Sequence, residues 1–373
     1  MAKNPSTISY GEAWDRNGAM ILPEKEENLL PIWEYSKTNH FRENLRQLNQ
    51  KLSISEATFQ RINFDIDYWQ KVASEKYPNG LPKPYSDDPT QWLFHGHPVK
   101  AENALQVAVA RLLGYRWPAE SDEEMELSDE ARELIKQVNE LELPVDEDGI
   151  VCIPPVYSEL PAAERLRQLL QQAWGDVWNN NVLAELLEQA GSKKNNLEDW
   201  LRDEFFANHC KVFKNRPFIW HIWDGRKDGF SALVNYHQLD KENLKKLIYT
   251  YLGDWIRRCE SKLKAGESGA DGLLSAALKL KEKLELILEG ESPYDIFVRW
   301  KKLDEQPIGW DPDLNDGVRL NIRPFVEAGV LRSRFNVKWG IDRGKNPAGS
   351  PWGEVRDNDL HLRLEEKRKA KEK

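Results

Sequence analysis

Apolar residues recur every three or four positions from Leu244 to Cys259, and this spacing constrains the fold more than any other feature of the sequence. With charged residues between its members, the stripe predicts an amphipathic helix that begins after Asp240, a suitable N-cap. A Gly-rich break at 265–272 separates it from a second amphipathic run, Leu273 to Leu288. Two such helices joined by a short loop predict an antiparallel helical hairpin within residues 241–291.

The pattern changes upstream of this hairpin. Residues 213–223 and 230–237 are rich in aromatic and β-branched side chains, and they flank a polar, Gly-bounded loop. This arrangement predicts a β-hairpin with Arg226 and Lys227 at its tip. Helical periodicity predicts further helices at 102–113, 161–174, 180–190 and 196–208. We therefore expect an α+β fold that is predominantly helical, with a β-hairpin in a small mixed sheet and the antiparallel helical hairpin.

Composition divides the chain into segments. In chain order we expect an N-terminal lead (1–28), an α+β recognition-like region (29–120), an acidic spacer (121–150), helices plus the β-hairpin (151–240), the helical hairpin (241–291), and a C-terminal α+β cap with a charged tail (292–373). No run reaches the roughly 18 apolar residues of a membrane span, and the N-terminus lacks the apolar core of a signal peptide. The three cysteines are widely spaced, as in a reducing compartment. These features predict a cytoplasmic protein with no membrane partner.

The net charge of −9 conceals an uneven distribution. Twelve acids and two bases at 121–150 give that stretch a net charge of −10, so the other residues sum to +1. Two stretches are basic: 205–227 carries a net charge of +4, and 318–345 a net charge of +5. Because phosphate contacts are local, such a basic face can bind nucleic acid whatever the sign of the total charge.

Signatures of common catalytic sites are absent from the sequence, which has no Gly-x-Gly-x-x-Gly, no Gly-x-x-x-x-Gly-Lys-Ser/Thr and no Gly-x-Ser-x-Gly. His95 and His97 can present two imidazoles to a metal, but two ligands do not make a site, and a turn or a packed surface is the alternative interpretation. His209, Cys210 and His221 are similarly incomplete. We predict no catalytic residue, no metal and no cofactor for this chain.

A basic, aromatic stretch leads into the predicted β-hairpin. Arginine and lysine can contact phosphates or guanine edges, while tryptophan and histidine can stack or wedge. The candidate DNA-contacting residues, taken from this stretch, the second basic region and the first histidine pair, are Lys211, Lys214, Arg216, Trp220, Trp223, Arg226, Lys227, Arg332, Arg334, Lys338, His95 and His97. The alternative is that Phe218, Trp220 and Trp223 are core residues of the hairpin, with Lys211 and Lys214 on its solvent face.

Longer segments of the sequence resemble a known protein family. The stretch Arg216-Pro-Phe-Ile-Trp-His-Ile-Trp223, continuing to Asp240, is similar to the C-terminal region of large adenine-specific DNA methyltransferases. These are the enzymes of type IIG restriction-modification and of BREX- and DISARM-like phage defence. Further phrases that resemble them lie at 85–98, 105–117, 249–255, 310–325 and 338–339.

The catalytic parts of that family have no counterpart in this sequence. There, a Gly-rich loop binds S-adenosylmethionine, and an Asn/Asp-Pro-Pro-Tyr/Phe motif holds the flipped adenine. The nearest string here, Ile153-Pro-Pro-Val-Tyr157, has isoleucine where the hydrogen-bond acceptor must be. The family's catalytic residues are therefore not carried over.

The resemblance implies a DNA-binding target-recognition module without a methyl-transfer site of its own. Its implied partners are double-stranded DNA and a catalytic methyltransferase chain, which would hold the S-adenosylmethionine, or other defence-system subunits. The main alternative is a protein-interaction subunit, or a fragment of a defence complex, that docks other defence proteins through residues 241–289 and the acidic stretch and does not itself contact DNA. A third is an autonomous methyltransferase or nuclease.

Overall fold

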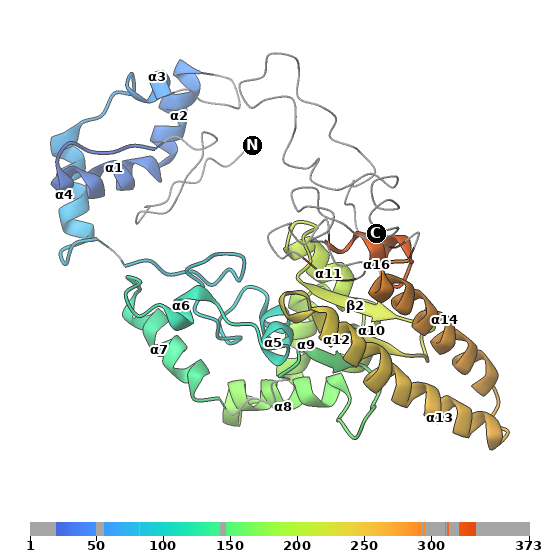
Figure 1. The fold of residues 1–373 in the computed structure, drawn as a ribbon. Helices are drawn as coiled ribbons and strands as arrows, with labels where there is room; N and C mark the ends of the chain where they lie inside the picture. The colour runs from blue at the N-terminus through green and yellow to red at the C-terminus, as the bar shows by residue number, and fades with distance from the viewer. Residues whose placement is uncertain are drawn as a thin grey trace, which may run out of the picture. The chain divides into compact units, whose positions relative to one another are not determined.

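Helices predominate in the computed structural model, and one three-stranded sheet accompanies them (Figure 1), which confirms the mainly helical α+β fold. The structure describes residues 20–49, 56–81, 83–141, 147–291, 294, 310, 312 and 321–332. The chain divides into two compact units, residues 1–84 and 85–373. This division falls within the region 29–120 that the sequence treats as one segment.

The described part of the first unit is helical. Its helices are η1 (Glu26–Asn28), α1 (Leu29–Ser36), α2 (Asn39–Leu48), α3 (Glu56–Phe59) and α4 (Ile66–Lys76). Side-chain caps fix where two of them begin: Thr38 accepts a hydrogen bond from the Phe41 amide, and Asp65 accepts one from the Tyr68 amide. Tyr35 and Phe41 lie in its small aromatic core.

The second unit is built around an antiparallel sheet in the order β1-β3-β2. The strands are β1 (Ile150–Cys152), β2 (Ile219–Trp223) and β3 (Ser231–Asn235). β2 and β3 form the predicted hairpin, with Trp220 opposite Val234. Almost every residue of the sheet is buried, so the strand sequences show no alternation of apolar and polar residues. β1 is missing from the sequence-based prediction because three residues at the end of an acidic stretch carry too little pattern.

Helices pack around this sheet and share one hydrophobic core with it. They are α5 (Ala104–Leu112), α8 (Ala162–Trp174), α9 (Asn180–Gln189), α10 (Leu197–Asp203), α11 (Phe205–Val212) and η3 (Tyr236–Gln238). The short η2 (Gly175–Val177) follows α8 and has no buried residue. The single helix predicted at 196–208 is two helices, α10 and α11. The chain leaves helical geometry at Glu204, where φ is −123°, and the Glu204 carboxylate accepts hydrogen bonds from Ser192 and Lys193.

The acidic stretch contains packed helix. Short α6 (Pro118–Ser121) precedes it, and α7 (Asp129–Asn139) lies within it, capped by the Ser128 hydroxyl. Ala131 and Ile135 of α7 pack in a small apolar cluster with Met125. The acidic side chains lie on the exposed face of α7, so a stretch that the sequence marks as a spacer is in part a folded layer.

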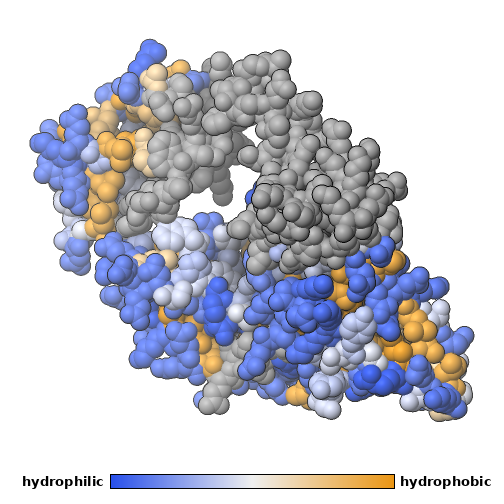
Figure 2. Space-filling model, viewed as in Figure 1, coloured by the Kyte–Doolittle hydropathy of each residue, from blue (hydrophilic) through white to orange (hydrophobic). Residues whose placement is uncertain are grey.

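The predicted helical hairpin is confirmed. It comprises α12 (Lys241–Lys246), a π-helical turn η4 (Leu247–Leu252), α13 (Gly253–Lys264) and α14 (Ala270–Glu289). α13 and α14 run side by side (Figure 1), and hydrophobic side chains gather along them (Figure 2). Further along, α16 (Arg323–Glu327) contributes Phe325 to the core, with its ring centroid 5.1 Å from that of Trp220.

Candidate nucleic-acid interface

A groove of about 550 Å³ opens on the second unit where four chain segments meet. Its lining residues are Pro89, Thr90, Tyr115, Arg116, Trp117, Phe213, Lys214, Arg216, Phe218 and His237. Five of them carry aromatic rings, three are cations, and none is acidic. A groove with three positive charges, in a chain whose net charge is −9, is suited to an anionic ligand.

Lys214 and Arg216 reach the groove from the turn that ends α11. Lys214 and Asn215 both adopt the left-handed backbone conformation, with φ of 54° and 60°. This conformation is uncommon for residues other than glycine, and it recurs at functional sites. The Asn215 amide donates to the Cys210 carbonyl at 2.7 Å, and the Arg216 amide donates to the Phe213 carbonyl at 3.0 Å. The turn is therefore fixed by its own backbone, while both cationic side chains remain exposed.

His209 fixes the start of β2 on the other side of this turn. Its Nε2 accepts hydrogen bonds from the Phe218 and Ile219 amides, both at 3.2 Å. Its Nδ1 then donates to Gln106 of α5, at 3.0 Å. The imidazole has no exposed surface, and burial lowers its pKa to about 3. His209 therefore acts as a neutral structural link that holds Phe218 in place.

Tyr115, Arg116 and Trp117 follow α5 directly. The helix ends at Gly114, where φ is 84°. The Trp117 amide donates to Glu120 Oε1 at 2.8 Å, and its indole donates to the Pro89 carbonyl at 2.9 Å. Backbone and ring are thus both anchored, and the Arg116 side chain between the two aromatic residues is exposed.

The rings of the groove also contact one another. Tyr115 donates its hydroxyl hydrogen to the Phe218 carbonyl at 2.6 Å, which leaves the hydroxyl oxygen to accept from Nδ1 of His237 at 3.0 Å. Burial raises the pKa of Tyr115 and lowers the pKa of His237. Near neutral pH both rings are uncharged, so the positive charge of the groove comes from its arginines and lysine.

Ion pairing separates the basic candidates into two groups. Arg226 pairs with Asp228 at 2.9 Å, and Arg332 pairs with Asp203 at 2.6 Å while covering the ring of Trp223, with 4.0 Å from Cζ to the ring centroid. By contrast, none of Arg116, Lys214 and Arg216 forms an ion pair with a described residue. The Arg116 guanidinium donates a hydrogen bond to the Tyr115 carbonyl at 2.8 Å, but its charge, like those of Lys214 and Arg216, is not neutralised by a described residue and can contact phosphate.

The remaining candidates from the sequence lie in different surroundings. Lys211 and Lys227 are exposed, on α11 and on the hairpin loop. Trp220 has no exposed surface and donates its indole hydrogen to the Pro217 carbonyl at 3.0 Å, so it belongs to the core. Arg334 and Lys338 lie outside the described residues.

His95 and His97 are buried and take part in a turn. Nδ1 of His95 accepts from the His97 amide at 2.9 Å, and Nδ1 of His97 accepts from the Val99 amide at 3.1 Å. Among the described residues there is no group of three or more histidines, cysteines or acids that could hold a metal ion. In this conformation neither imidazole can reach DNA, which favours the turn interpretation of this pair.

Sequence reasoning identified Lys214 and Arg216 but not the rest of the groove. Tyr115, Arg116 and Trp117 belong to a phrase that resembles the methyltransferase family, yet no site residue was predicted there. One sequence feature could have indicated this site: Arg116 is a cation between two aromatic residues, and the three follow directly after Gly114, where α5 ends. His237 gave no such signal, because its place in the groove depends on the pairing of β2 with β3.

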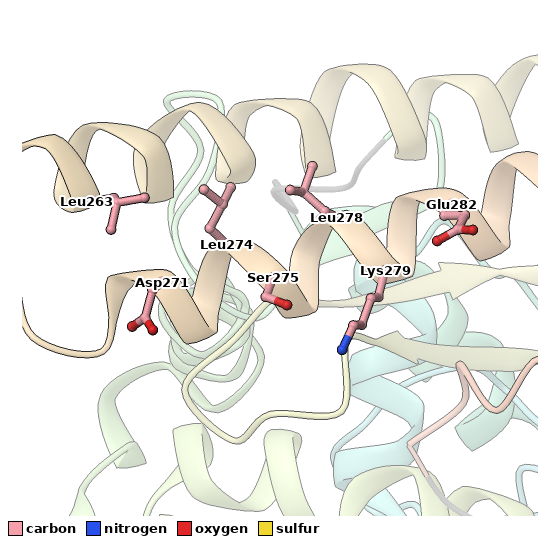
Figure 3. A pocket seen from close by; sticks show the side chains of 7 residues that line it. All are labelled: Leu263, Asp271, Leu274, Ser275, Leu278, Lys279 and Glu282. Carbon is pink, nitrogen blue, oxygen red and sulfur yellow. The ribbon is translucent and has the colours of Figure 1, made fainter.

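A second cavity, of about 350 Å³, lies on the helical hairpin. Leu263 of α13 faces Leu274 and Leu278 of α14 there (Figure 3), and Leu263 and Leu278 are 44% and 46% exposed. The polar lining consists of Asp271, Ser275, Lys279 and Glu282. With one more acid than base and an apolar floor, this surface is suited to a protein rather than to DNA.

None of the helices in the described ranges is both long enough and apolar enough to cross a bilayer.

Comparisons with known proteins agree with the family resemblance at a distance. No family model matches the chain. The chain is 23% identical to the adenine-specific methyltransferase BrxX of Escherichia coli O9:H4 (strain HS) over 197 residues, which cover 49% of this chain and 16% of BrxX. It is 27% identical to the adenine-specific methyltransferase PglX of Lacticaseibacillus casei (strain Zhang) over 174 residues, which cover 45% of this chain and 13% of PglX. The chain is thus a distant homologue of adenine-specific methyltransferases and matches only a small part of each.

Proposed function

We propose that this chain is a DNA-binding target-recognition module that works with a catalytic adenine-specific methyltransferase chain in a restriction-modification or phage-defence system. The observation that carries the proposal is the groove in which the exposed Arg116, Lys214 and Arg216 have no ion-pair partner among the described residues. Such cations supply the phosphate contacts that position a protein on DNA. The exposed Lys211, three residues before Lys214, extends the basic surface, and Lys227 adds an exposed cation at the opposite end of β2.

The sequence supports separate roles for two chains, one that selects the DNA site and one that transfers the methyl group. BrxX and PglX are adenine-specific methyltransferases, and the matched part covers 16% and 13% of them. This sequence has no Asn/Asp-Pro-Pro-Tyr/Phe motif. A partner chain would therefore hold the S-adenosylmethionine and carry out the methyl transfer, while this chain selects the site. Radiolabelled methyl-transfer assays should give no signal with this chain alone.

The salt dependence of DNA binding tests the proposal. Affinity of the purified chain for a labelled duplex should fall steeply between low and physiological salt. The triple variant Arg116→Ala, Lys214→Ala, Arg216→Ala should reduce the slope of log K against log salt by up to about 2.7, since each neutralised phosphate contributes about 0.9. The matched control replaces Lys262, Lys264 and Lys279, three exposed cations of the helical hairpin, and should keep the wild-type slope. Absent or salt-independent binding would rule the proposal out.

A second candidate function is protein docking through α13 and α14. The exposed leucines of the second cavity favour it, because apolar side chains grouped around a groove commonly mark protein interfaces. Leu263→Ser with Leu278→Ser should then abolish co-purification with a methyltransferase chain and leave duplex binding unchanged. If duplex binding is absent and co-purification depends on these leucines, the docking function replaces DNA recognition.

A further inference from the structure

The rings of the groove exceed what contact with a duplex backbone requires. Tyr115, Phe213 and Phe218 line it and are only half-buried. A duplex keeps its bases stacked and offers only their edges in the grooves, so phosphate contacts to a duplex need cations but no aromatic floor. Cations combined with aromatic rings are the usual composition of sites for unpaired nucleotides, whose bases stack on the rings.

The arrangement of the rings is fixed before any ligand binds. Phe213 and Phe218 meet edge to face with centroids 4.5 Å apart, and Phe218 and Tyr115 meet in the same way at 4.8 Å. Phe218 is held through its amide by His209 and through its carbonyl by Tyr115. Preorganised rings lose little conformational entropy when a ligand stacks on them.

The size of the groove agrees with a short, unpaired element. Its volume of about 550 Å³ lies within the range of about 300–1,000 Å³ that is typical of small-ligand pockets. The ring contacts run from Tyr115 through Phe218 to Phe213. Arg116 is adjacent to Tyr115 in the chain and Lys214 is adjacent to Phe213, so cations adjoin both ends of this row of rings and are available for the phosphates that flank one base.

We propose that this groove binds an unpaired nucleotide of the DNA, whose base stacks on the aromatic rings and whose flanking phosphates contact Arg116, Lys214 and Arg216. The inference rests on the proposed DNA-binding function and adds the structural class of the ligand. Because the sequence has no adenine-binding motif of the methyltransferase type, the nucleotide held here is not one positioned for methyl transfer.

A comparison of three labelled DNA probes tests this inference on the full chain. The probes are a perfect duplex, the same duplex with one unpaired thymidine, and a single-stranded dT 12-mer. The chain should bind the bulged duplex at least about fivefold more tightly than the perfect duplex. Phe213→Leu should weaken binding to the bulged duplex and to the 12-mer by about 5- to 150-fold, a larger loss than for the perfect duplex. Phe213→Tyr keeps a ring and should retain the preference.

Each outcome separates the inference from the proposed function. Equal affinity of wild type for the bulged and perfect duplexes would overturn the inference and leave DNA recognition in place. Failure to bind any probe would overturn both. A crosslinking experiment on the wild-type chain avoids any folding defect of a variant: 5-iodouracil at the unpaired position should crosslink to peptides containing residues 115–117 or 213–218. Crosslinks confined to other peptides would overturn the inference.

Discussion

Glu120 connects three parts of the molecule at the scale of a single residue. Both of its oxygens accept hydrogen bonds from the Arg111 guanidinium at 2.9 Å, and Oε1 also accepts from the Trp117 amide. The two charged side chains are 1% and 3% exposed. Gly96 lies against the pair, where a Cβ would be 2.2 Å from Glu120 Oε1, and its φ of +80° favours glycine. This buried pair thus positions the Trp117 side of the groove.

Glu120→Ala should lower the free energy of unfolding by about 3–5 kcal/mol, because it leaves the Arg111 charge buried without a partner. Urea denaturation followed by tryptophan fluorescence measures this change. The matched control is Glu130→Ala, which breaks an exposed ion pair with Lys100, at 2.8 Å, and should cost less than about 1 kcal/mol. Equal effects of the two variants would show that the buried pair is not the stabilising element described here.

At the scale of elements, the loop between β2 and β3 is a closed structure rather than a loose tip. The Asp224 carboxylate accepts from the Arg226 amide at 2.9 Å and from the Phe230 amide at 2.8 Å. Arg226 in turn is engaged by Asp228, at 3.0 Å and 2.9 Å. Of the two cations at this tip, only Lys227 is available to phosphate without breaking an ion pair with a described residue.

Replacement of Asp228 should release the second cation of the loop. In Asp228→Asn the Arg226 guanidinium loses its charged partner, so we expect tighter duplex binding and a salt slope that is steeper by up to about one counterion. Fluorescence anisotropy across a salt series measures both quantities. Asp176→Asn, in η2 and exposed, serves as a control for the general loss of a negative charge, because Asp176 is not among the charges that act on Arg226. An unchanged slope in the Asp228 variant would place this loop outside the interface.

Elements were more predictable than the site they form. The helices at 102–113, 161–174 and 180–190, the β-hairpin and the helical hairpin follow from local periodicity, which the sequence displays directly, whereas α1 to α4 and α7 were not predicted from it. Lys214 and Arg216 were found because they stand among aromatic residues in one short stretch. Trp220 was chosen on the same ground and His95 as one of a histidine pair, but the burial of both depends on contacts with distant segments. Arg116 and His237 were missed for the same reason, since α5, α11 and β3 bring them together.

At the scale of the whole molecule, buried histidines link stability to pH. Burial lowers the pKa of His95 and of His97 to about 4, and the pKa of His209 and of His221 to about 3. The unfolded chain therefore binds protons below about pH 6.5 that the folded chain does not bind. Their effect is absent above that pH and destabilises the fold increasingly as the pH falls. Glu159 and Asp224, whose pKa values burial raises, act in the opposite direction.

The free energy of unfolding should fall between pH 7.5 and pH 5.5 by about 1 kcal/mol per buried histidine. Urea titrations at several pH values measure the slope. His209→Gln should make the fall in the free energy of unfolding smaller by the contribution of one histidine, about 1 kcal/mol. The matched control is His40→Gln, because His40 is exposed. A wild-type free energy that is constant over this range would contradict the assignment of these histidines as neutral buried groups.

The π-helical turn Leu247–Leu252 makes the helical hairpin sensitive to chain length. A residue that is added to or removed from a helix rotates everything beyond it by about 100° about the helix axis. Because a π turn holds one residue more than an α turn, a deletion within it can be absorbed by conversion to an α turn, whereas a deletion directly after it would rotate Ile256, Cys259 and Leu263 about the axis of α13. In this part of the chain, insertions and deletions would therefore destabilise the helical hairpin more than most substitutions. The direction in which each side chain points from the helix axis matters as much as which side chains the helix contains.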